Sequence, residues 1–164
     1  MAYPTVSAPY GLEPINSVDG KPYAGAIRQI PITASYGTAI YNGDVVQLVV
    51  GGTVEKSSVA SNVQATPTLG VFVGCSYTNS SGQPVQAQYY PTGVTNAVAY
   101  VVLDPQAAFK VAVTTAGDTS TVTYVTRAVV GTNIGAAAGT GSNTTGDSGL
   151  SVVSGTAANT AVLP

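Results

Sequence analysis

"LGVFVGCSY", residues 69–77, is the stretch that decides the fold of this chain. It is an almost continuous apolar run with two glycines, and such a run of valine and aromatic residues is typical of a buried β-strand. The polar segment "TNSSGQ" (78–83) predicts a turn, and the alternation in "PVQAQYY" (84–90) predicts a half-buried strand after it.

Short β-rich runs with turn signals between them continue on both sides of this stretch. "DVVQLVV" (44–50) and "TVEKSSV" (53–59) flank Gly51-Gly52, which predicts a hairpin. Further strands are expected in "AIRQIPI" (26–32), "AVAYVVL" (97–103) and "AAFKVAV" (107–113). This spacing predicts an all-β fold, a compact antiparallel β-sandwich or barrel. The expected core contains Val71, Phe72, Val73, Val101, Leu103 and Phe109.

Charged residues are unusually scarce in this chain. Its 164 residues include five basic and seven acidic side chains, so 7% of the chain is charged, against about 25% in ordinary soluble domains. A free monomer with so few charges is poorly protected against association, and we therefore expect copies of the chain or a larger assembly to cover much of its surface. The few basic residues are scattered and form no patch for nucleic acid, and no apolar run is long enough to predict a membrane-spanning helix.

The composition of residues 1–24 predicts an extended N-terminal arm, which is followed by a β domain that covers residues 25–164. Four prolines in this span disfavour a helix, and tyrosines are spaced along it. Such an arm can lie across a neighbouring molecule, and the residues expected to bind that partner are Tyr3, Tyr10, Leu12 and Tyr23. The other interpretation, which the sequence leaves open, is that the arm folds back over its own barrel.

Residues 131–149 have the composition of a flexible linker, mainly Gly, Ala, Ser, Thr and Asn. Strand-like runs, "LSVV" (150–153) and "TAVLP" (160–164), follow them. We therefore expect a long Gly/Ser/Thr-rich surface loop within the β domain that leads to a last pair of strands.

The sequence contains no recognisable set of catalytic residues. It has no histidine, which removes the commonest general base and the commonest metal ligand. Its one cysteine, Cys75, lies in an apolar strand, where a buried and unreactive thiol is expected. Asp44, after the Asn42-Gly43 turn, is compatible with a calcium ligand, but we favour a role in completing the turn. We therefore predict no enzymatic activity, no metal site and no cofactor.

The ten tyrosines are open to two interpretations. Tyr77, Tyr89 and Tyr90 are candidates for a platform that binds glycans. A tyrosine-rich subunit interface is equally natural, because a buried tyrosine contributes a large contact area and one hydrogen bond.

Several stretches of the chain resemble a known family. "YGLEPINSVDGKPYAGAIRQIPI", "IYNGDVVQLV", "GVFVGCSYTNSSGQPV" and "LDPQAAFKV" occur in this order, and "GTGSNTTGDSGLSVVSGTAANTAVLP" ends the chain. Together they resemble the head cement or decoration proteins of tailed bacteriophages. The resemblance covers most of the chain, and the third and fourth stretches are its most specific parts.

The resemblance implies a non-enzymatic virion protein on the outer capsid surface, made in the cytoplasm of the host bacterium. Its expected partners are the major capsid protein and copies of itself, with a trimer favoured and a dimer possible. Nucleic acid and membrane are not expected as partners. The alternatives are a phage tail or fibre component, a surface-layer module, or a glycan-binding module on the virion surface.

Overall fold

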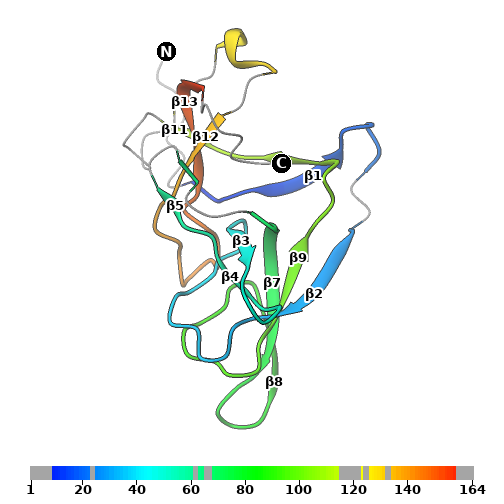
Figure 1. Cartoon of the computed structure of the whole chain (residues 1–164), viewed down its shortest axis with the longest axis vertical. Coiled ribbons are helices and arrows are strands. Elements are labelled where there is room, and N and C mark those ends of the chain that lie inside the picture. The colour runs from blue at the N-terminus through cyan, green and yellow to red at the C-terminus, as the bar shows by residue number, and fades with distance from the viewer. Residues whose placement is uncertain are drawn as a thin grey trace.

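The computed structural model describes residues 9–22, 25–60, 63, 64, 68–114, 123, 126–131 and 134–157. Its regular structure is almost entirely β, arranged in several mainly antiparallel sheets (Figure 1), which confirms the predicted all-β class. Within these residues the one helical element is a 3-10 turn, η1 (Arg127–Val129). The strands are β1 (Glu13–Ser17), β2 (Ile27–Pro31), β3 (Val45–Leu48), β4 (Val54–Lys56), β5 (Val59–Ala60), β6 (Val63–Gln64), β7 (Gly70–Thr78), β8 (Pro84–Ala87), β9 (Val98–Val102), β10 (Ala107–Lys110), β11 (Val113–Thr114), β12 (Ile134–Ala137) and β13 (Ser151–Ala157).

The long strand β7 organises the largest sheet. One edge of β7 pairs with β9, while the other edge pairs with β3 at its start and with β8 at its end. The register shifts between Phe72 and Gly74, and Gly74 has a φ of 145°, a conformation that side-chain-bearing residues rarely adopt. Such a bulge bends and twists a strand, which allows β7 to change partners along its length.

The six-stranded sheet curls toward a barrel. Its strand order is β2-β9-β7-β3-β4, with β8 attached to β7. Its two ends meet just after β2, where Ile32 forms a parallel bridge with Val54 and the Thr33 N–H donates to the Val54 carbonyl at 3.3 Å. The predicted hairpin around Gly51-Gly52 is confirmed, since β3 and β4 pair across it.

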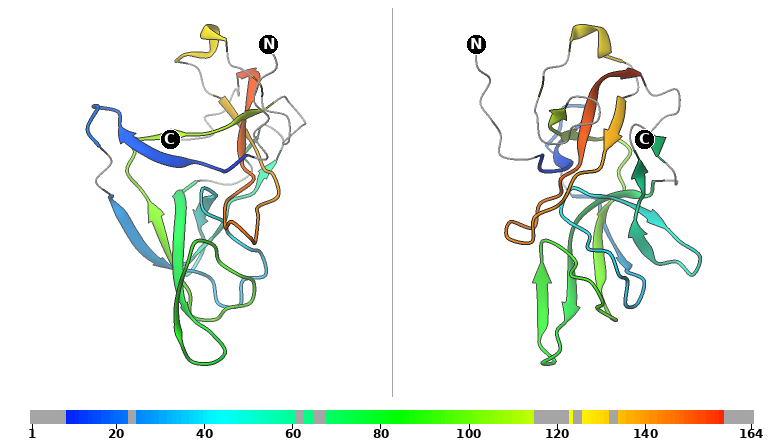
Figure 2. Two further views of the ribbon diagram at one scale, coloured as in Figure 1. Left: turned by 180° about the vertical axis from the view of Figure 1, so that it is seen from behind. Right: turned by 90° about the vertical axis from the view of Figure 1, so that its left-hand side faces the viewer.

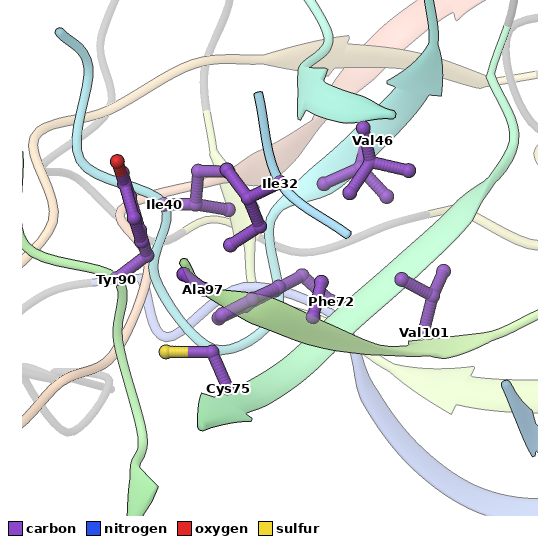
Figure 3. Close-up of a cluster of buried hydrophobic side chains, with 10 residues drawn as sticks. Ile32, Ile40, Val46, Phe72, Cys75, Tyr90, Ala97 and Val101 are labelled. Carbon is purple, nitrogen blue, oxygen red and sulfur yellow. The ribbon is translucent and has the colours of Figure 1, made fainter. Parts of the chain in front are cut away.

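The main core fills the inside of this curled sheet (Figure 3). Its fully buried members come from several strands and from the loops between them, and they are Ile32, Ile40, Val46, Val54, Phe72, Cys75, Tyr90, Ala97, Ala99 and Val101. The Tyr90 hydroxyl lies at the edge of the cluster and donates to the carbonyls of Tyr36 at 3.2 Å and Val94 at 3.0 Å. This satisfies the polar end of the ring, as burial requires.

A second apolar cluster lies between the curled sheet and the two-stranded β1–β10 sheet. Its buried members are Leu12, Val45, Val71, Val102 and Leu150, and Val73, Ala107, Phe109 and Val111 pack against them. The predicted core residues Val71, Phe72 and Val101 are therefore confirmed, whereas Val73, Leu103 and Phe109 are only half-buried.

The C-terminal part forms a third sheet, in which β13 pairs in parallel with β11 and antiparallel with β12. The prediction of a surface loop over residues 131–149 is wrong at β12, where Gly135, Ala136 and Ala137 are buried, whereas residues 138–149 form a loop that leads to β13. Glycine and alanine allow backbones to approach closely, and a Cβ atom at Gly139 would clash with the Gly149 carbonyl. The strand predicted at 150–153 corresponds to β13, and the one predicted at 160–164 lies outside the described residues.

Candidate interaction surfaces

Leu12, expected to bind a partner, lies instead in the chain's own core. It is 3% exposed and packs in the cluster with Val45 and Leu150. β1 follows it directly and pairs with β10 from Glu13 opposite Lys110 onward. The expectation of an arm separate from the β domain is therefore wrong for residues 12–17, which pack on the chain's own domain as in the other interpretation that the sequence left open. The physical reason is that the Leu12 side chain fills the space between two sheets, which removes it from water.

Tyr10 lies half-buried on the same side of the domain. The Lys110 Nζ atom is 5.2 Å from the centre of the Tyr10 ring and 2.7 Å from the Glu13 Oε2 atom. The hydrogen bond to Glu13 is the main cause that raises the pKa of Lys110. Tyr3 and Tyr23 lie outside the described residues, so of the four predicted partner residues the structure describes Tyr10 and Leu12.

An apolar pocket of about 240 Å³ opens beside this cluster. Its apolar lining includes Leu12, Leu69, Val102, Leu103 and Phe109, and Asp104 also lines it. A shallower hollow bounded by Ala26, Ile27 and Arg28 shares Leu103 and Asp104 with it. A side chain of another molecule placed in such a pocket would be removed from water, which is typical of binding hot spots.

Several exposed apolar residues are near the pocket-lining residues in the sequence. Ile15 in β1 is 48% exposed, Val18 after β1 is 77% exposed, and Ile27 at the start of β2 is 46% exposed. Figures 1 and 2 show that β1 and the start of β2 lie on the same side of the molecule. We call Ile15, Val18 and Ile27 the β1–β2 surface. Isolated exposed apolar residues are normal, but these three belong to segments that also contribute Leu12 to the apolar pocket and Ile27 to the adjoining hollow, which makes them a candidate interaction surface.

Asp44 is fully buried and serves the structure. Its Oδ2 atom accepts a hydrogen bond from the Tyr41 N–H at 2.8 Å and lies 2.8 Å from the Lys56 Nζ atom. Its Oδ1 atom accepts a 2.6 Å hydrogen bond from the Ser148 hydroxyl. The carboxylate thus completes the Asn42-Gly43 turn, as the favoured interpretation predicts, and also joins the turn to β4 and to the C-terminal segment.

Tyr77, Tyr89 and Tyr90 do not form one platform for a glycan, because Tyr90 is unavailable. Tyr90 is fully buried, so its ring offers no face to a ligand. Tyr89 stacks on Tyr41 with ring centres 5.6 Å apart, and the Tyr41 hydroxyl donates to Asn143 Oδ1 at 2.7 Å. Tyr77 is half-buried and lies at the edge of a separate hollow.

Other chemistry in the described part of the chain is limited. Among those residues, His, Cys, Asp and Glu side chains form no group of three or more that could hold a metal ion. Cys75 is buried, and burial raises the pKa of its thiol to about 11, so the prediction of a buried thiol is confirmed. None of the described helical structure is long and apolar enough to span a membrane.

Comparison of the chain with family models, with curated proteins and with solved structures finds no match.

Proposed function

We propose that this chain is a non-enzymatic structural protein of a tailed-bacteriophage head. It binds the outer face of the shell formed by the major capsid protein and cements adjacent capsomers. The observation that carries the proposal is the β1–β2 surface beside an apolar pocket, on a chain with only twelve charged residues. The resemblance of "GVFVGCSYTNSSGQPV" and "LDPQAAFKV" to the cement proteins gives the class of partner.

The mechanism of cementing is repeated weak contact. An apolar surface of a few side chains supplies modest affinity at one site, but copies that also contact one another bind a lattice with high avidity. A trimer fits a local three-fold axis of a capsid, and a dimer is the alternative. Because the contact is mainly apolar, attachment depends little on salt.

The location of the protein is tested on purified full heads that lack tails, with an antibody against this chain followed by a cryo-electron density map. We expect the chain on the outer surface of the shell, between capsomers. Detection in tails or fibres with none on heads would contradict the proposal and favour the tail or fibre alternative.

The docking surface is tested with variants of exposed residues that leave the core intact. Ile15→Asp and Ile27→Asp should lower occupancy on heads, because each places a carboxylate where an apolar contact forms. Val50→Asp is the matched control, since Val50 is fully exposed in the turn between β3 and β4 and is not part of the β1–β2 surface. Full occupancy by both test variants would show that the chain does not dock through this surface.

A further inference from the structure

A hollow of about 450 Å³ with a mixed polar and apolar lining lies between the β7–β8 hairpin and the loop at 92–96. Figures 1 and 2 show this hairpin at the opposite end of the long axis from η1. The lining residues are uncharged, and they are Tyr77, Thr78, Asn79, Ser80, Thr92, Gly93, Val94, Thr95 and Asn96. The hollow is therefore separate from the apolar pocket in position and in chemistry.

Hydrogen bonds hold both walls of the hollow in place. The Asn79 Oδ1 atom accepts from the N–H groups of Ser81 and Gln83, each at 3.0 Å, and the Asn79 Nδ2 atom donates to Gln83 Oε1 at 3.1 Å. On the other wall, the buried Tyr90 hydroxyl donates to the Val94 carbonyl. A site whose walls are already fixed loses little conformational entropy when a ligand binds.

The side chains in the hollow combine an aromatic ring with neutral hydrogen-bonding groups. The Tyr77 ring packs against the main core and also lines the hollow, and burial is the main cause that raises the pKa of its hydroxyl. The Asn96 Oδ1 atom accepts a 3.4 Å hydrogen bond from the Thr78 N–H, which leaves its amide N–H groups as donors. Thr92 and Thr95 add exposed hydroxyls.

We propose that this hollow binds a neutral hexose unit of a glycan, with the Tyr77 ring against the C–H face of the sugar. A pyranose has one face of C–H groups and an edge of hydroxyls, which matches an aromatic wall beside amides and hydroxyls. Charged sugars are disfavoured, because no cation lines the hollow to pair with a carboxylate or sulfate. This proposed sugar binding is a property of the isolated chain and does not depend on whether the chain attaches to a capsid.

The experiment uses the full chain in solution. An array that carries oligosaccharides of glucose, galactose, mannose and N-acetylglucosamine, together with sialylated counterparts, identifies the best neutral probe. NMR titration of the ¹⁵N-labelled chain with that probe then measures affinity in four variants. Tyr77→Ala should weaken binding about tenfold and Tyr77→Phe less than about threefold, because the ring supplies the stacking contact. Thr95→Arg, an exposed substitution that fills the hollow, should abolish binding, and Thr126→Arg beside η1 is the matched control.

Two results would overturn the proposal. One is the absence of array signal and of chemical-shift change for all neutral probes at about 10 mM sugar, well above the range of useful affinities. The other is binding that survives Thr95→Arg, which would place the sugar elsewhere. The Thr95 variant keeps the test decisive if Tyr77→Ala fails to fold.

Discussion

Truncation of Leu12 measures how much the packing of the N-terminal segment contributes to the free energy of unfolding. Leu12→Ala removes three carbon atoms from a side chain that is 3% exposed. At about 0.8 kcal/mol per buried carbon this lowers the free energy of unfolding by about 2–3 kcal/mol. This loss of stability is near the lower end of the range for Leu→Ala substitutions at buried sites. The reason is that Leu12 already borders an open pocket, so its truncation creates little additional enclosed cavity. For a chain of this length, the melting temperature should fall by about 5–10 °C.

The assay is urea and thermal unfolding of the full chain, followed by circular dichroism. Ile15→Ala is the matched control, since Ile15 lies three residues further along and is half exposed, and its effect should stay within about 0.5 kcal/mol. Equal stabilities of Leu12→Ala and the unmodified chain would refute the reasoning. Residues 9–17 would then behave as a detachable arm in solution.

Four further predictions concern other features of the molecule. Ser148→Ala removes a hydrogen bond from the buried Asp44 carboxylate and should lower the free energy of unfolding by about 1–3 kcal/mol, measured by urea unfolding. Gly70→Ala should lower it by about 1–3 kcal/mol or more in the same assay, because a Cβ atom there would clash with the Val102 carbonyl. The pKa of Cys75 is raised to about 11, so little thiolate exists at neutral or mildly alkaline pH; a disulfide reagent at pH about 8 should label it only after denaturation, and rapid labelling of the native chain would contradict its burial. Attachment to heads should persist from pH about 5 to 8, since the chain has no histidine, and release by moderate salt would count against an apolar contact.

The strands of the curled sheet were predictable because their signal is local. The apolar run at 69–77 and the Gly51-Gly52 turn each follow from neighbouring residues, and β7 and the β3–β4 hairpin lie there. Leu12 was not predictable as a core residue, because its burial depends on Val45 and Leu150, which are distant in sequence. β12 was missed because glycine and alanine carry little apolar surface, so the burial of Gly135, Ala136 and Ala137 leaves no hydrophobic pattern in the sequence.

The candidate sites show the same division between local and distant signals. Tyr77 was identified from the sequence as a residue for glycan contact, but its partners in the hollow were not. Thr92 and Asn96 line the same hollow as Tyr77 because β8 turns back along β7 and is followed by the loop at 92–96. Tyr90 looked equivalent to Tyr77 in the sequence, yet the Tyr90 ring is fully buried in the core, whereas the Tyr77 ring borders a hollow.

The two proposed sites also lie on different parts of the chain. The β1–β2 surface belongs to β1, the residues after it and the start of β2, whereas the hollow lies between the end of β7 and the loop at 92–96. Figure 1 shows the β7–β8 hairpin at the far end of the molecule from β1. β7 connects them, because its first residues border the apolar pocket and its last residues border the hollow. A chain held through the β1–β2 surface would therefore leave the hollow open to solvent. Its Asn79 hydrogen bonds would keep the hairpin in shape without help from a partner.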